Sequence, residues 1–371
     1  MNLRDRLQRI QQMQQSGEVS PLPKPVSKQT SQTGQDDKTS QPGQNCLPEW
    51  ETSGYQTQRR DITVSEKFLL PQTMPETACA IMPGIAGSYE NLLFFDLETT
   101  GLSGGAGTVA FLAAFGRLFF DATATQTHAV YSMKITQYLL LDYPGEYDFI
   151  KALLGEFNDN TVVVSYNGKT FDSQILKTRC LMNGIQPPEY RHADLLHPSR
   201  RLWKRLLPDC SQGTIETGIL CLDRTGDIPG ALAPDIWFSF LKNGETDMLL
   251  GICEHNRRDI TGLAAIFCAI AAITHNPIAA LEKTQFDIES LSLRLRNIDL
   301  LRYAAEKAAT GEYPPLRPIT LRALAIDSEH KRKKLKEALA FAEQGLDLLP
   351  SDSVLKKDFI RRIERLRKKE K

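Results

Sequence analysis

The chain has 371 residues, 41% of them hydrophobic, and a formal net charge of +0. This length and composition predict a globular chain of two or three domains with at least one large core. The balanced charge excludes a global field that would attract a polyanion, so a nucleic-acid surface would have to come from local clusters of Lys and Arg. The seven cysteines form no CxxC pair, which excludes a thioredoxin-like or CxxC-type zinc site. The sequence contains no uninterrupted apolar stretch of about 18 residues, the length that would predict a membrane span. We therefore expect a cytoplasmic protein.

Two N-terminal segments precede the expected core. Residues 1–15 place apolar side chains at helical spacing, which predicts a short amphipathic helix. Residues 16–55 are rich in Ser, Gln, Pro, Gly and Thr and hold few large apolar side chains, too few to offset chain entropy by burial. We therefore expect a disordered linker between the helix and the core.

Residues 60–280 alternate between strand-like and helix-like periods and predict one α/β domain. The runs at 92–98, 108–120 and 127–141 have a strand pattern and are separated by Gly or short polar turns, so they predict an antiparallel meander. Further along, GEYDFIKALLGEFN has helical period, TVVVSYN is a β-branched strand, and KTFDSQILKTRCLMNG predicts a helix that ends at Gly184.

Residues 285–371 change to charged segments of helical period, at 287–309, 318–346 and 351–371, which predict a separate all-helical domain. KLKEALAFAEQGLDLLPSD is similar to one hairpin of a tetratricopeptide-like repeat, although the sequence holds no second clear copy. The terminal stretch LKKDFIRRIERLRKKEK concentrates positive charge, so it is either a solvated helix face or a nucleic-acid contact. These helices are also a candidate site for a protein partner.

Two carboxylates, Asp96 and Glu98, stand one residue apart at the end of an apolar strand. Side chains alternate faces along a strand, so both acids project to one side and Leu97 to the other. Neighbouring acids repel each other unless a cation neutralises them, and carboxylate oxygens favour Mg²⁺ or Mn²⁺. A frayed, solvated strand end is the alternative. Asp172, at the start of a helix after a strand, and Asp259, on a helix whose other face is apolar, would complete a four-acid site.

The segments FDLETTGL, SYNGKTFD and HNRRD resemble the three exonuclease motifs of the DEDD superfamily, which has a ribonuclease H-like fold. The stretches GLSGGAGTVAFL, DLLHPSRRLWKR and IPGALAPDIWFSFLKNGETDMLLGICEHNRRDI are similar to its YprB-like branch, and the resemblance spans about 91–270. It implies a mixed sheet flanked by helices and a 3′–5′ exonuclease acting on DNA or RNA. In that family the matching acids hold two divalent cations, Mg²⁺ or Mn²⁺, for a two-metal mechanism: Asp96, Glu98, Asp172 and Asp259.

The same resemblance implies substrate contacts. The residues after the first two acids would bind the terminal nucleotide: Thr99, Thr100, Gly101 and Leu102. Asn167 and Phe171 would orient the Asp172 loop and stack on the substrate, unless they are simply a turn asparagine and a buried phenylalanine. A strip of four cations is a candidate phosphate contact: Arg200, Arg201, Lys204 and Arg205.

His255 departs from the family pattern. DEDD exonucleases place a His five residues or a Tyr four residues before the last acid, and here a His has the four-residue spacing. On a helix this spacing puts His255 and Asp259 on one face, so the imidazole could orient the attacking water or accept its proton. A helix-capping or core histidine is the alternative. His192 and His197, which flank Asp194, have no spacing that makes them metal ligands.

Two other functions stay open at this stage. The same fold could act as a structure-selective endonuclease if its groove is open at both ends. The chain could also be a non-catalytic nucleic-acid-binding or scaffold protein that uses its C-terminal helices for protein contacts. The presence of all four acids argues against a loss of catalysis.

Overall fold

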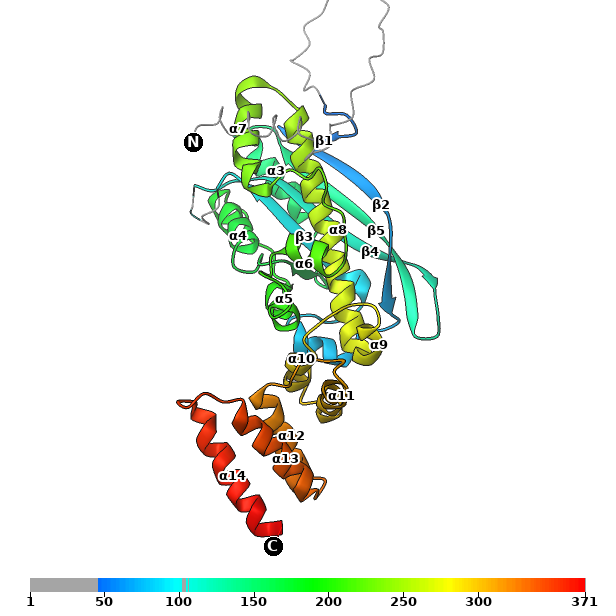
Figure 1. Ribbon diagram of the computed structural model, residues 1–371. Coiled ribbons are helices and arrows are strands. Elements are labelled where there is room, and N and C mark those ends of the chain that lie inside the picture. The colour runs from blue at the N-terminus through cyan, green and yellow to red at the C-terminus, as the bar shows by residue number, and fades with distance from the viewer. Residues whose placement is uncertain (1–45, 102–104, 106, 371) are drawn as a thin grey trace, which may run out of the picture. The chain divides into compact units, whose positions relative to one another are not determined.

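A computed structural model describes residues 46–101, 105 and 107–370. The helix predicted at 1–15 and most of the linker predicted at 16–55 therefore lie outside the described residues. The chain divides into two compact units (Figure 1). The first unit contains the described residues up to Pro198 together with Asp209–Asn276, and the second contains Ser199–Pro208 and the chain from Pro277 onward.

The first unit is built on a mixed sheet, which confirms the predicted fold class. Its strands, in the described part of the chain, are β1 Glu51–Gly54, β2 Thr57–Pro71, β3 Leu92–Thr99, β4 Ala110–Thr123, β5 His128–Leu140, β6 Val162–Ser165 and β7 Arg191–Asp194. Their order across the sheet is β1-β2-β5-β4-β3-β6-β7. β3, β4 and β5 form the predicted antiparallel meander, whereas β6 runs parallel to both β3 and β7.

The sheet starts earlier than the sequence predicts, because part of the expected linker is ordered. β1 pairs with β2, and Trp50, just before β1, is only 4% exposed. Leu47 and Trp50 belong to the hydrophobic core, and the Arg60 guanidinium lies 4.8 Å from the centroid of the Trp50 ring. The segment is polar in composition, but Leu47 and Trp50 are exceptions. Their burial against the sheet offsets the entropy lost when the segment becomes ordered.

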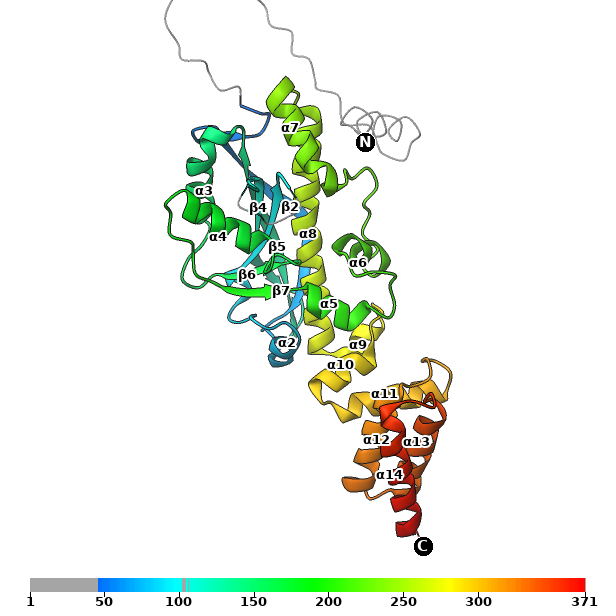
Figure 2. The same cartoon turned by 90° about the vertical axis from the view of Figure 1, so that its left-hand side faces the viewer.

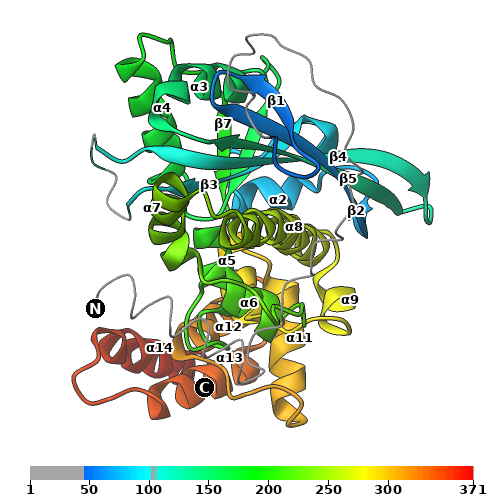
Figure 3. The same cartoon turned by 90° about the horizontal axis from the view of Figure 1, so that it is seen from above.

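Helices cover both faces of this sheet. The described helices up to Asn276 are α2 Glu76–Ile81, α3 Glu146–Leu154, α4 Asp172–Met182, α5 Leu196–Trp203, α6 Gln212–Gly218, α7 Ala233–Asn243 and α8 Asp247–His275, and most of α5 belongs to the second unit. Figures 2 and 3 show α3 and α4 on one face and α8 on the other. α8 contacts β2, β3 and β4, and 56% of its most apolar stretch is buried. By length and composition α8 could cross a membrane, but in this fold it is a core helix.

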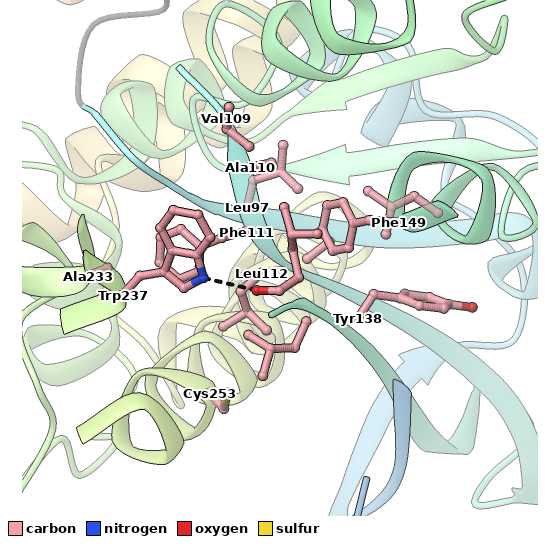
Figure 4. Packing of buried hydrophobic residues seen from close by; sticks show 14 of the residues in the cluster. Leu97, Val109, Ala110, Phe111, Leu112, Tyr138, Phe149, Ala233, Trp237 and Cys253 are labelled. Atoms are coloured by element: carbon pink, nitrogen blue, oxygen red, sulfur yellow. Dashed lines mark hydrogen bonds between the residues drawn. The ribbon is translucent and has the colours of Figure 1, made fainter. Parts of the chain in front are cut away.

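The alternation of side chains along β3 separates the core from the site. Phe95 stacks on Phe115 at 5.1 Å, within the core that includes α3 and α4, and Leu97 belongs to the same cluster. Phe94 points the other way and meets Phe267 of α8 at 5.7 Å. Trp237 of α7 stacks on Phe111, near the start of β4, and donates from Nε1 to the carbonyl of Leu140 at the end of β5 (Figure 4). Asp96 and Glu98 therefore share the α8 side of the sheet with Phe94.

The second unit is helical, as predicted. Its helices after Asn276 are α9 Pro277–Leu281, α10 Ile288–Leu295, α11 Ile298–Ala309, α12 Pro318–His330, α13 Leu335–Asp347 and α14 Val354–Glu370. Two of the predicted helical segments are each divided into a pair of helices. The first division is at Arg296, whose φ of 53° ends α10, and the second is near Lys333, whose φ is 58°.

The segment Ser199–Pro208 also belongs to the second unit, although the sequence places it inside the α/β domain. Trp203 is fully buried, and its Nε1 donates to the carbonyl of Gln285 at 2.9 Å. The Asp287 N–H donates to the carbonyl of Leu202 at 2.8 Å. Burial of this tryptophan against residues far along the chain is a tertiary contact that local periodicity does not reveal.

Candidate active site

Four acidic residues from three segments of the chain line one cavity of about 240 Å³ in the first unit: Asp96, Glu98, Asp172 and Asp259. β3 and β6 are parallel neighbours, so their carboxyl ends lie at the same edge of the sheet. Asp96 and Glu98 lie near that end of β3, and the chain leaving β6 leads into α4, whose first residue is Asp172. The fourth acid comes from the middle of α8, which packs beside β3.

The loop between β6 and α4 is shaped to present Asp172. The carboxylate of Asp194, at the end of β7, accepts hydrogen bonds from the N–H groups of Asn167 at 2.9 Å and Lys169 at 3.0 Å. Asn167 has a φ of 64°, in the left-handed region. A Cβ on Gly168 would lie 2.6 Å from Oδ2 of Asp172, so the close turn requires glycine there.

The acids destabilise one another's charged forms. Burial raises the pKa of Asp96 well above its ordinary value, and the charges of Asp259 and Asp172 raise it further. Burial and the charge of Asp96 also raise the pKa of Glu98 well above its ordinary value. The pKa of Asp172 is raised to about 7 by burial and by Asp194. Such a cluster either holds protons or binds cations, and its hard oxygen donors fit divalent metals such as Mg²⁺ or Mn²⁺.

Glu98, His255 and Asp259 place one ligand atom each within 4.8 Å of one another, close enough to surround a single ion. Glu98 is 8% exposed, and the other two are partly buried. The spacing brings two of the four carboxylates to one point, where a metal ion would fit. It also shows that the imidazole faces the carboxylates.

His255 lies in the cavity, with its two ring nitrogens in different surroundings. Nε2 is 3.3 Å from Oδ2 of Asp259 and 3.9 Å from Oε1 of Glu98. Nδ1 is 2.9 Å from Oδ1 of Asp227. Burial alone would lower the pKa of His255, but the hydrogen bond with Asp227 and the charge of Asp259 outweigh it and raise the pKa.

Arg224 places a cation inside this acidic site. Its guanidinium contacts Glu216 and Asp259 at 2.5 Å each and Asp227 at 2.6 Å. Burial opposes its charge, yet these three carboxylates raise the pKa of Arg224 above its usual value. In return, Arg224 partly offsets the effect of burial on the pKa of Glu216.

Asn256 orients the first acid from α8. The side chain is 0% exposed, and its Nδ2 donates to Oδ2 of Asp96 at 2.7 Å. Nε2 of Gln137 donates to the Asn256 oxygen at 2.9 Å, which fixes the amide with its donor toward Asp96. The residue stands next to His255 in the third motif, so its place in the sequence is a signal that could have identified it.

Sequence reasoning also missed Glu216, Arg224 and Asp227. Glu216 lies on the short helix α6, and Arg224 and Asp227 lie in the polar loop between α6 and α7. Arg224 and Asp259 are 35 residues apart in sequence, and Asp227 and His255 are 28 apart. No signal from a single sequence links these pairs.

The other predicted site residues divide into two groups. Thr99, Asn167 and Phe171 line the cavity with the acids. The Thr100 hydroxyl accepts a hydrogen bond from the Val109 N–H at 2.9 Å. Gly101 follows it, and a Cβ on Gly101 would lie 3.6 Å from Oγ1 of Thr108. Leu102 lies outside the described residues.

The predicted cationic strip belongs to the second unit, whereas the acids belong to the first. Arg200 and Arg201 are exposed on α5. Arg205 lies within 4 Å of Asp287 and Glu289, which are 4% and 2% exposed, so part of its charge is used within the unit. The strip therefore stays a prediction with respect to phosphate binding.

His192 is a structural histidine, in agreement with the absence of a ligand spacing around it. Its Nε2 lies 2.8 Å from the Ser165 hydroxyl and its Nδ1 3.2 Å from that of Ser173. Burial lowers the pKa of His192 to about 4, so the ring is neutral at physiological pH. It supports the turn between β6 and α4 from the side of β7.

Comparison with known proteins agrees with this architecture. The model of the RNase H superfamily matches residues 93–271, which contain all four acids and His255. The uncharacterized protein YprB of Bacillus subtilis (strain 168) is 34% identical over 297 residues, which cover 69% of this chain and 69% of the relative. The chain therefore belongs to one family with YprB, and its residues 93–271 form a domain that matches the RNase H superfamily.

Proposed function

We propose that the protein is a divalent-metal-dependent 3′–5′ exonuclease that hydrolyses nucleic-acid phosphodiester bonds. The match of residues 93–271 to the RNase H superfamily supports a nuclease. The observation that carries the proposal is the set of four carboxylates from β3, α4 and α8 around one cavity. Burial and repulsion within the set raise the pKa values of Asp96 and Glu98, and burial and Asp194 raise that of Asp172. Buried carboxylates in this excess destabilise the fold unless cations bind and neutralise part of their charge.

Each residue has a distinct task in this mechanism. The carboxylates of Asp96, Glu98, Asp172 and Asp259 would hold Mg²⁺ or Mn²⁺. Two such ions lower the pKa of an attacking water and stabilise the leaving oxygen when they are bound. His255 Nε2, which faces Asp259 and Glu98, accepts the proton of that water. Thr99 and Phe171 line the same cavity, where they would contact the terminal nucleotide.

The C-terminal helix α14 contributes less to nucleic-acid binding than its charge suggests. Arg362, Arg365 and Lys369 all bond to Glu329, and Arg367 bonds to Glu343. These intramolecular ion pairs favour the solvated-face interpretation of the basic stretch over the phosphate-contact one. A protein partner for the second unit stays a proposal, as does a cytoplasmic location.

The test is digestion of end-labelled single- and double-stranded DNA and RNA in Mn²⁺, with the Asp96→Asn protein as the control for contaminating nucleases. We expect mononucleotides to be released from a free 3′ end, and protection when that end is blocked. Cleavage of a covalently closed circle would instead establish the endonuclease. If the protein bound nucleic acid but hydrolysed none of these substrates, the proposal of an enzyme would be wrong, and the non-catalytic alternative would be supported.

A further inference from the structure

The loop between α6 and α7 encloses His255 on both of its nitrogens. Asp227 lies against Nδ1 at 2.9 Å. At the other end of the loop, a Cβ on Gly230 would lie only 2.9 Å from Nε2. The ring, on α8, is thus held in one orientation by a segment that carries none of the four acids.

The hydrogen bonds of Asp227 are assigned by its neighbours. Nη1 of Arg224 can only donate, so Oδ2 of Asp227 accepts that bond at 2.6 Å. Oδ1 of the same carboxylate accepts from Nδ1 of His255, which must then carry a proton. In the neutral ring this leaves the lone pair on Nε2, the nitrogen that faces Asp259 and Glu98.

The rival assignment places the proton on Nε2, where it would point at Asp259. That contact is longer, 3.3 Å against 2.9 Å, and Oδ1 of Asp259 already accepts from Arg224. Cations at the four acids would reduce their ability to accept a hydrogen bond further. Both considerations favour the proton on Nδ1.

We propose that Asp227, tethered by Arg224, is a positioning residue that holds His255 in the Nδ1–H tautomer so that Nε2 can accept a proton. The inference rests on the proposed hydrolytic function for its consequence, but the tautomer itself is a property of the free protein. It also explains how a histidine at the unusual four-residue spacing is directed toward the site, since the orienting group comes from outside its own helix.

Asp227→Asn is the decisive variant because it preserves shape and reverses the hydrogen bonds. The new amide must turn its oxygen toward Arg224, since the opposite orientation would place two donors together. Its NH₂ then donates to Nδ1 of His255 and moves the ring proton to Nε2. Asp121→Asn is the matched control: that carboxylate, on β4, accepts from Lys67 of β2 and Ser132 of β5 and does not line the cavity.

The first measurement is the tautomer, read from ring ¹⁵N shifts of the full-length protein at an alkaline pH where the imidazole is neutral, with Mg²⁺ and without substrate. His255→Gln identifies the signal among the six histidines. We expect Nδ1–H in the wild type and in Asp121→Asn, and Nε2–H in Asp227→Asn. An Nε2–H ring in the wild type would overturn the proposal, even if the variant did not fold.

The second measurement is steady-state hydrolysis. Asp227→Asn should lower kcat by about 10²–10⁴-fold, the usual contribution of a general base, with KM and Mn²⁺ affinity changed by less than about threefold. A merely structural role would alter KM or thermal stability and leave the tautomer unchanged. An unchanged kcat with the reversed tautomer would refute the positioning role, whereas a wild type that hydrolyses nothing would refute the proposed function and leave the tautomer result standing.

Discussion

A carboxylate cluster in the first unit and a single buried carboxylate in the second show opposite electrostatics. In the first unit, four acids share a cavity, and burial and repulsion hold the pKa values of Asp96 and Glu98 well above the ordinary range. In the second, the 0% exposed side chain of Glu329 accepts hydrogen bonds from Arg362, Arg365 and Lys369. Burial would raise the pKa of Glu329, but Arg365 and Lys369 lower it to about 2.

The difference separates a binding site from a structural contact. The charge of Glu329 is neutralised by cations of the same chain, so its ion pairs stabilise the packing of α12 against α14. The acidic cavity has a single guanidinium among the described residues that contact it, from Arg224, and that group is divided among three carboxylates. An uncompensated cluster of this kind lowers stability unless an ion from solution completes it. The following changes should break or sharpen this contrast.

The largest effect is expected from Asp96→Asn and Asp172→Asn. Each variant removes a charge from the proposed metal ligands, so hydrolysis should fall by at least about 10³-fold, which corresponds to several kcal/mol of transition-state stabilisation. Without metal, the Asp96→Asn protein should melt at or above the temperature of the wild type, because a repelled carboxylate has been neutralised. End-label digestion and thermal melts in EDTA measure the two properties.

Addition of Mn²⁺ is the control for these variants. At an Mn²⁺ concentration of 100 times the wild-type Kd, binding should stabilise the wild type by about 2.7 kcal/mol. The same concentration should stabilise Asp96→Asn by clearly less. Activity within tenfold of the wild type in either variant would contradict the metal assignment.

His255→Ala should lower turnover by about 10²–10⁴-fold. The imidazole is expected to accept a proton rather than to hold the ion, so Mn²⁺ affinity should change little. Single-turnover hydrolysis and calorimetric titration of Mn²⁺ separate the two effects. Full turnover in this variant would make His255 a structural histidine.

Glu329→Gln should act on the second unit alone. Loss of hydrogen bonds between a buried carboxylate and cationic donors is typically worth about 1.5–3 kcal/mol. Faster hydrogen exchange in α12 and α14 would report it, with β3 and α8 and the hydrolysis rate unchanged. Glu343→Gln is the matched control, because the partly exposed pair with Arg367 should contribute at most about 1 kcal/mol.

The smallest effect is the pH dependence of stability without metal. The pKa of Glu329 is about 2 in the folded state against 4.5 in the unfolded chain, so its contribution is complete above pH 4.5 and is lost as the pH falls toward 2. Asp96 and Glu98 have raised folded-state pKa values, so they destabilise the first unit as the pH rises above about 4. Hydrogen exchange between pH 3.5 and 4.5 should show opposite trends in the two units, each at most about 1.4 kcal/mol per group.

The sequence by itself determined the features that depend on local period. Alternation along β3 was enough to predict that Asp96 and Glu98 point to one side and Leu97 to the other. In the structure Asp96 and Glu98 face Asn256 and His255 of α8, whereas Leu97 packs in the core cluster with Phe95. The meander and the C-terminal helices follow from the same local patterns. Burial of an apolar face requires such periods, so they are visible in any single chain.

Tertiary structure alone decided which distant groups meet. Trp50 orders a segment of polar composition, Trp203 joins its segment to the second unit, and Asp227 meets His255 from 28 residues away. Asn256 reaches Asp96 across 160 residues. Hydrogen bonds and ion pairs of this kind need only a correct position in space, which the packing of α8 and the loop before α7 supplies, and they place no periodic constraint on the sequence that encodes them.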